Sequence, residues 1–226
     1  MSSDLLFILM GVDEKKKGVP LTFLLFSAPG GNQKTCAGYN MEIIRKLLQK
    51  WKNSLGICGG ESFKPYVAIN NTDLMERGAL VLVFPRIWLL ICKFHLHQCW
   101  KNHQCKVLKG KSLEQTDLKQ RLFHLEDSLI ATVSISKARN LILSEMHVLI
   151  KKQSPLTAKA IEHLKYLDSY WTTDALWHCW SDYGRKIASS LLKCPFEGVL
   201  PTTNHLESFN GVLKCKHLAQ WQNGGH

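Results

Sequence analysis

The chain has 226 residues, of which 45% are hydrophobic, and it carries 29 Lys or Arg against 18 Asp or Glu, a formal net charge of +11. This length and apolar content are enough to build a hydrophobic core, which excludes a mainly disordered chain. The longest apolar stretch, Gly78 to Cys92, is interrupted by Pro85 and Arg86, and it is shorter than the roughly 18–20 residues that a membrane-spanning helix needs.

The basic excess bears on the partners of the protein. It favours a polyanion such as nucleic acid or an acidic surface, and it carries no information about the fold. The first residues lack the basic head and long apolar run of a secretory leader, so we expect an intracellular chain. The eight Cys are accordingly interpreted as reduced thiols, some buried and some available to a metal.

The first third of the chain predicts a hairpin followed by a helix. Two apolar runs, Leu5 to Val12 and Val19 to Ser27, flank a polar segment that contains a glycine, which is typical of an antiparallel hairpin. The next periodic stretch predicts a helix with Asn40 as its N-cap and Gly56 as its stop. The apolar face of this helix holds Ile44, Leu47, Leu48 and Trp51.

Strand and helix patterns then alternate. Tyr66 to Ile69 and Ile87 to Cys92 are short apolar runs suited to buried strands. A helix is predicted between them from Leu74 to Phe84, and another follows from about His95 to His103. This order favours an α/β fold in which helices cover a hairpin-edged sheet.

From Leu113 to about Leu192 the periodicity is helical throughout. Pro195 and Pro201 then bracket a turn, and a last helix begins near Asn204. Two apolar helix stripes are expected in this region: Leu118, Leu122, Leu125 and Leu129; and Leu141, Ile142, Met146, Leu149 and Ile150. We therefore predict three segments: an α/β core over 1–110, a helical insertion over 111–200, and a C-terminal helix over 201–226 that returns to the core.

Asp73 is the first candidate for a chemical role, because it stands where a strand passes into a helix, and such residues converge at the carboxyl edge of a sheet. A carboxylate there can bind Mg²⁺, which prefers oxygen ligands. The alternative is structural. Asp73 with Glu76 three residues later has the spacing of a capping box at a helix N-terminus.

Glu207 is the second candidate. Leu206, Phe209 and Leu213 form the expected buried stripe of the last helix, which leaves Glu207 on another face. Beside Asp73, it would help to form a carboxylate site for two metal ions and phosphodiester chemistry. The alternative is again a cap, with Asn204 at the helix start and Glu207 three residues on.

Cys92 and His95 form a Cys-x2-His pair, a spacing that suits zinc ligands on one side of a turn. His97, Cys99, His103 and Cys105 follow within ten residues of His95. A closed zinc site needs four ligands, and the remaining spacing matches no familiar finger. A packed, structural role for the pair is the alternative.

The basic residues are concentrated between Lys93 and Arg121, where seven Lys or Arg stand against Glu114 and Asp117. Lys15 to Lys17 and the stretch from Arg45 to Lys52 add further positive charge. Contact with phosphates is the functional interpretation, and it predicts affinity that falls with salt. An ordinary solvated surface is the alternative.

Together these motifs resemble the transposase domain of Mutator-like elements (MULE), a family of DDE recombinases with an RNase H-like fold. Four blocks carry the resemblance, in the family's order, from about Asp13 to Lys214. They are Val12-Asp13 with Gly18-Val19-Pro20-Leu21-Thr22-Phe23; Asn71-Thr72-Asp73-Leu74 with Ala79-Leu80 and Phe84-Pro85; Cys92-Lys93-Phe94-His95 with Trp100; and Thr202-Thr203-Asn204 with Glu207-Ser208-Phe209-Asn210-Gly211-Val212-Leu213-Lys214.

The resemblance implies an RNase H-like mixed sheet with a helical insertion before the last helix. It also implies three carboxylates that hold two divalent ions, Mg²⁺ or Mn²⁺, for cleavage and strand transfer of double-stranded DNA in the nucleus. Asp73 and Glu207 match the second and third of these carboxylates. The first, in a block resembling Asp-x-Thr-Tyr on an earlier strand, has no counterpart, and neither Asp4 nor Asp13 has its context.

We therefore expect a MULE-type transposase core that is truncated at its N-terminus, lacks its first strand, and is inactive alone. The alternative is a domesticated DNA-binding or regulatory protein derived from a transposase. A zinc-dependent module built on Cys92 and His95 is a third interpretation. The sequence leaves open whether the chain forms a homo-oligomer.

Overall fold

The computed structural model describes residues 4–27, 40–58 and 60–217, and the chain divides into two compact units. Unit 1 consists of Met1–Pro65, Asp73–Ile87 and Thr203–His226, and unit 2 of Tyr66–Thr72 and Trp88–Thr202. Each unit is built around its own buried apolar side chains. Both units are discontinuous in sequence, because the chain passes between them several times.

Unit 1 begins with the predicted hairpin. β1 (Asp4–Val12) pairs antiparallel with β2 (Gly18–Ser27), and the register shifts at Leu9 and Met10. Asp13 closes the turn, because its Oδ1 accepts from the Lys17 amide at 2.7 Å and its carbonyl accepts from the Lys16 amide at 2.9 Å. The local sequence thus folds the hairpin as expected.

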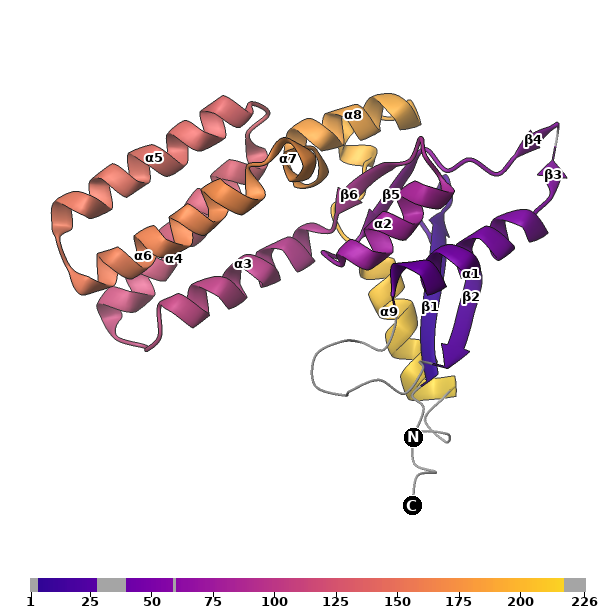
Figure 1. Ribbon diagram of the computed structural model, residues 1–226, viewed down its shortest axis with the longest axis horizontal. Coiled ribbons are helices and arrows are strands. Elements are labelled where there is room, and N and C mark those ends of the chain that lie inside the picture. The colour runs from indigo at the N-terminus through magenta and orange to yellow at the C-terminus, as the bar shows by residue number, and fades with distance from the viewer. Residues whose placement is uncertain (1–3, 28–39, 59, 218–226) are drawn as a thin grey trace, which may run out of the picture. The chain divides into compact units, whose positions relative to one another are not determined.

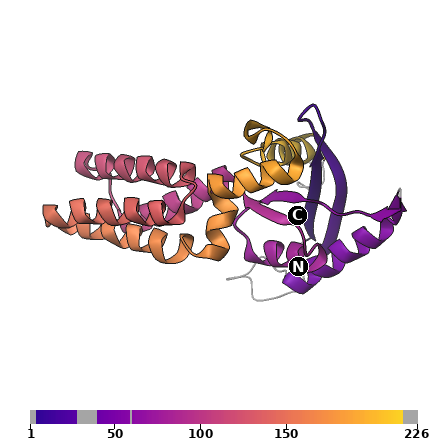
Figure 2. The ribbon, with the colours of Figure 1, turned by 90° about the horizontal axis from the view of Figure 1, so that it is seen from above.

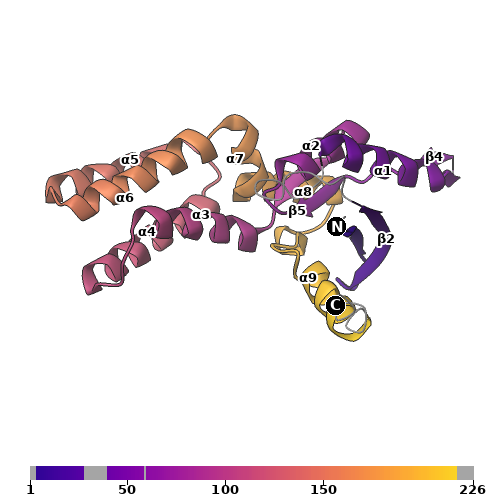
Figure 3. The same cartoon turned by 60° about the horizontal axis from the view of Figure 1, so that its bottom comes forward.

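Helices lie against both faces of this hairpin. α1 (Met41–Ser54) and α2 (Leu74–Val83) pack around Leu24 through side chains that include Ile44 and Val83. On the opposite face, Phe23 contacts Phe209 of α9 (Asn204–Val212), with ring centres 5.9 Å apart. Adjacent strand residues point to opposite faces, so unit 1 has three layers (Figure 3). A short π-helical turn, η3 (Leu213–His217), continues α9.

The start of α1 confirms the cap predicted there. The Asn40 side chain accepts from the amide of Ile43 at 3.0 Å. This bond satisfies one of the amides that a helix start leaves without a partner. A short antiparallel ladder follows α1, in which β3 (Ile57–Cys58) pairs with β4 (Glu61–Ser62).

Unit 2 contains the predicted pair of strands. β5 (Val67–Asn70) and β6 (Trp88–Ile91) are parallel, and α7 (Asp174–Trp180) and α8 (Asp182–Leu192) contact β6. β6 is mostly buried, whereas β5 is only half-buried. The indole N–H of Trp88 donates to the carbonyl of Gly184 at 2.9 Å. Leu90, Ala188 and Val199 are buried together behind the strands. A 3₁₀ turn, η2 (Phe196–Gly198), leads toward the end of the unit.

The rest of unit 2 is an array of helices that lie alongside one another (Figures 1 and 2). It comprises α3 (Lys93–Val107), α4 (Leu113–Ala131), α5 (Ile135–Lys152), α6 (Pro155–Tyr166) and the π-helical turn η1 (Leu167–Trp171). Ser112, Ser134 and Ser154 cap the starts of α4, α5 and α6 through side-chain oxygens. Trp100, Trp177 and Trp180 are fully buried among these helices.

The structure confirms a mixed α/β protein that is mostly helical. The described residues form three separate two-stranded ladders instead of one continuous sheet, because β1–β2 and β5–β6 belong to different units. The predicted helical insertion, 111–200, lies within unit 2. In the described part of the chain, no helix is long and apolar enough to cross a membrane.

Two of the expected apolar stripes need correction. Ile150 is 53% exposed, because it lies about 100° around α5 from the buried Leu149. Leu206, Phe209 and Leu213 are half-buried rather than buried, since α9 contacts the hairpin along one side and is otherwise exposed.

Candidate functional site

Asp73 is the N-cap of α2. Its Oδ1 accepts from the amides of Met75 at 2.7 Å and Glu76 at 3.2 Å, and its backbone is extended. The capping interpretation is therefore confirmed. Whether the carboxylate also binds a divalent cation stays a prediction, because capping engages only one of its two oxygens with these amides.

Replacing Asp73 separates these two roles. Asp73→Ala is expected to lower the free energy of unfolding by about 1 kcal/mol, because both amides lose their acceptor. Asp73→Asn should cost only a fraction of that, since asparagine caps helices nearly as well as aspartate. Urea unfolding followed by circular dichroism measures both, with Asn40→Ala on α1 as a control for the loss of a cap. Equal losses for the Ala and Asn variants would show that the negative charge, rather than the cap, stabilises the fold.

Glu207 lies in the first turn of α9 and is exposed. The predicted Asn204 cap is wrong, because the helix begins at Asn204 and Thr203 precedes it as the N-cap residue. The amide of Glu207 donates to the carbonyl of Thr203 at 3.0 Å, so Glu207 is one residue beyond the capping-box position. Glu207 and Asp73 both belong to unit 1.

Cys92 and His95 lie at the start of α3. Cys92 is 1% exposed at the N-cap position, and His95 is half-buried, with its ring against that of Phe94 at 5.4 Å. Within residues 4–27, 40–58 and 60–217, no three His, Cys, Asp or Glu side chains gather where they could hold a metal ion. Zinc at this pair stays a prediction.

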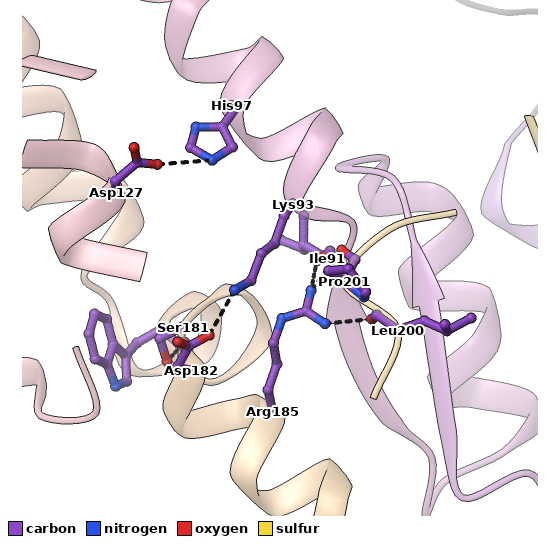
Figure 4. Close-up of polar contacts among 10 residues, drawn as sticks. Ile91, Lys93, His97, Asp127, Ser181, Asp182, Arg185, Leu200 and Pro201 are labelled. Atoms are coloured by element: carbon purple, nitrogen blue, oxygen red, sulfur yellow. Dashed lines mark hydrogen bonds and ion pairs between the residues drawn. The ribbon is translucent and has the colours of Figure 1, made fainter. Parts of the chain in front are cut away.

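A buried arginine that the sequence did not single out lies beside this helix start. Arg185 of α8 is 2% exposed, and its guanidinium donates to the carbonyls of Leu200 at 2.7 Å, Ile91 at 3.0 Å and Pro201 at 3.1 Å (Figure 4). Burial lowers the pKa of Arg185, and the nearby Asp182 opposes that shift. The arginine ties the end of β6 to the segment that precedes α9.

Lys93 completes this cluster. Its backbone amide donates to the carbonyl of Pro201 at 2.9 Å, and its ammonium pairs with Asp182 at 2.9 Å (Figure 4). Lys93 stands in the basic stretch predicted to contact phosphate, but its charge is neutralised by an acid on α8. The contacts of Lys93 therefore stabilise the fold of unit 2.

A second buried polar group was also missed. Glu126 of α4 and His163 of α6 are 1% and 0% exposed, and they are bonded to each other at 2.8 Å. Neither residue has a neighbour in sequence that signals the pairing, because their partners come from other helices.

The remaining lysines of the basic stretch are exposed, except for Lys119, which is half-buried. From Arg77 to Leu113 the sequence contains no Asp or Glu. Lys106, Lys109 and Lys111 lie where α3 passes into α4, and among the described residues none of the three pairs with an acid. Lys151 and Lys152 end α5 at the same end of the helical array (Figures 1 and 2). We call these five residues the lysine end; Glu114 at the start of α4 is the acid nearest to it in sequence.

No known family model, curated protein or solved structure matches the chain in comparisons with known proteins.

Proposed function

We propose that the protein is a MULE-type transposase core whose present function is to bind double-stranded DNA. Asp73 and Glu207 are two carboxylates that remain from an ancestral DNA-cleaving site. The observation that carries the proposal is the order of the four sequence blocks. The hairpin, Asp73 with α2, the start of α3 and the helix of Glu207 follow one another in the order of those blocks, and the helical array precedes the last of them.

The carboxylates by themselves do not fit a site for two divalent ions. The resemblance implies three carboxylates, and two have been matched. One oxygen of Asp73 is engaged in capping, and among the described residues there is no group of three His, Cys, Asp or Glu that could hold a metal ion. We therefore assign no cleavage step to this chain, and the proposal rests on binding.

The lysine end is the surface that we assign to DNA. Its five ammonium groups are carried by the ends of α3 and α5 and by the loop before α4, so they project from one end of unit 2. Exposed ammonium groups that no acid neutralises can replace the counterions of a phosphate backbone. Sequence-independent affinity follows from such contacts, since phosphates carry no base identity.

Removing four of these charges tests the proposal. Replacing Lys109, Lys111, Lys151 and Lys152 by alanine is expected to weaken binding to a duplex at least tenfold at about 0.1 M salt, and to reduce the slope of log affinity against log salt by about 0.9 for each phosphate that is no longer neutralised. Fluorescence anisotropy with a labelled duplex over a range of NaCl measures both. Lys137→Ala is the control, because it is also exposed on α5 but lies roughly 21 Å along the helix from Lys151.

Affinity that ignores salt, or equal losses for Lys137→Ala and the fourfold variant, would reject the lysine end as the DNA surface. The same duplex incubated with Mg²⁺ or Mn²⁺ tests the catalytic alternative. Nicking by the wild-type protein that disappears in Asp73→Asn and Glu207→Gln would show an active recombinase in place of the binding protein proposed.

A further inference from the structure

A continuous line of polar side chains crosses the interior of the helical array in unit 2. His163 of α6 lies at its centre and is fully buried. Its Nε2 is 2.8 Å from Oε1 of Glu126 on α4, and its Nδ1 is 2.9 Å from Nδ1 of His103 on α3. Three helices are therefore joined through the two ring nitrogens of one imidazole.

Few other charged groups lie near Glu126, His163 and His103. His103 is half-buried and stacks on Tyr166, with ring centres 3.8 Å apart, and the Tyr166 hydroxyl contacts Cys99 at 3.7 Å. Burial raises the pKa of Tyr166 to about 12, so the phenol stays neutral. Glu162 on α6 and Lys106 on α3 are the charged groups that act on His103 from outside, with opposite signs. α5, which also packs against α6, buries only the apolar residues Ala138, Ile142 and Leu149.

The hydrogen bonds determine how many protons the imidazoles of His163 and His103 can carry. An ionised Glu126 only accepts, so Nε2 of His163 carries a proton and donates it. The two Nδ1 atoms are 2.9 Å apart and share one proton, which either imidazole can carry. His103 Nε2 is the one nitrogen left to take up another. With that proton, the imidazole pair carries one positive charge, which Glu126 balances. The hydrogen bonds from His163 to Glu126 and to His103 both remain.

A further proton on the imidazole pair cannot be accommodated in this arrangement. It would have to bind the second Nδ1, so that two N–H groups, each on a cation, would face each other at the distance of one hydrogen bond. Both the bond and the neutrality of the buried group would be lost, and burial of an unbalanced charge is strongly unfavourable. The two imidazoles must then separate.

We propose that Glu126, His163 and His103 form an acid-sensitive latch, which holds α3 and α6 together while the two imidazoles share at most one positive charge and releases them when each imidazole carries one.

The direction of the pH dependence agrees with the environment of His103. Burial, followed by the proximity of His163, lowers the pKa of His103 from its ordinary value of 6.5. The closed latch therefore binds protons less readily than an open one in which the imidazole is solvated. The stabilisation is fully present above pH 6.5 and is lost as the pH falls below that value. Each additional proton bound by the open form raises its population about tenfold per pH unit.

Amide hydrogen exchange of the full chain, corrected for intrinsic rates, tests the latch between about pH 7.5 and 4.5. As the pH falls below the ordinary histidine pKa, protection of α3 and α6 is expected to fall about tenfold per pH unit, while α1 and α2 keep theirs. His103→Asn should abolish this acid response. The asparagine amide can take the place of Nδ1 as donor or acceptor and cannot become charged. His147→Asn, at an exposed histidine of α5, is the control and should respond like the wild type.

Three results would overturn the latch: an unchanged acid response in His103→Asn, constant protection of α3 and α6 in the wild type, or an equal loss in α1 and α2, which would indicate global unfolding. If His103→Asn does not fold, imidazole ¹⁵N shifts of the wild-type protein decide. The latch requires that the second imidazole becomes charged only together with the loss of protection in α3 and α6. Two charged imidazoles with protection retained would contradict it.

Discussion

Trp100→Ala is expected to lower the free energy of unfolding of unit 2 by about 3–5 kcal/mol, the usual cost of deleting a buried large aromatic side chain. Trp100 is 0% exposed on α3, and its ring meets Trp180 and Trp171 edge to face, with centres 5.2 and 5.8 Å away. Such contacts add about 0.5–1.5 kcal/mol per pair beyond the burial of apolar area. The cavity left by the deletion would be lined by the other two indoles, which are themselves held by the helices around them.

Trp100→Phe is the matched variant. The indole N–H of Trp100 is buried, and no described residue accepts a hydrogen bond from it. Phenylalanine keeps a ring in the contact and removes this group, whose burial without a partner costs about 1–3 kcal/mol. We therefore expect a much smaller loss than for alanine. Urea unfolding measured by tryptophan fluorescence is suitable, because Trp88, Trp171, Trp177 and Trp180 all remain in unit 2. Similar losses for the two variants would mean that the ring contacts contribute little.

Arg185→Met is expected to cost about 2–4 kcal/mol, because three carbonyls around the guanidinium lose their donor, and a buried acceptor without a partner costs about 1–3 kcal/mol. The total stays below the sum of three such terms, since removing Arg185 also removes a buried charge and the cost of its desolvation. The change should act first at the junction of β6 with the segment before α9.

The amide of Lys93 provides a local measurement of that change. It donates to the carbonyl of Pro201, one of the groups that Arg185 holds. In Arg185→Met, we expect faster hydrogen exchange at this amide than the global loss of stability explains. Arg139→Met is the control, because Arg139 also donates to a carbonyl, that of Thr172 at 2.9 Å, but is itself exposed. An unchanged Lys93 amide would show that the segment is held without the arginine.

The elements that the sequence predicted well are those with local signals. The hairpin has a polar turn in which Asp13 bonds residues three and four positions away, and α1 begins at an asparagine that caps it. The helices of unit 2 follow their apolar periodicity. The cap at Asp73 belongs to the same class, because its acceptor and donors lie within three residues.

The polar groups inside unit 2 had no such signals. Glutamate is rarely buried without a partner, and no residue near Glu126 in sequence indicates that it lies inside the fold. Its partner His163 lies 37 residues away on another helix. Arg185 binds backbone carbonyls. Because every residue has a carbonyl, the residue types near Arg185 do not indicate these contacts. Predicting the Glu126–His163 pair or the contacts of Arg185 would require knowing how the helices pack together. Apolar periodicity alone does not give that packing.

The discontinuity of the two units has a consequence for how the protein is made. The chain passes from one unit to the other after Pro65, Thr72, Ile87 and Thr202, and the contact between Phe23 and Phe209 joins nearly the two ends of the described chain. On the ribosome, the hairpin emerges long before the helix that covers its second face. Leu21 and Phe23, which are still 47% and 49% exposed in the finished fold, would be more open to solvent until then. The nascent chain is therefore expected to need protection from aggregation until α9 has been synthesised.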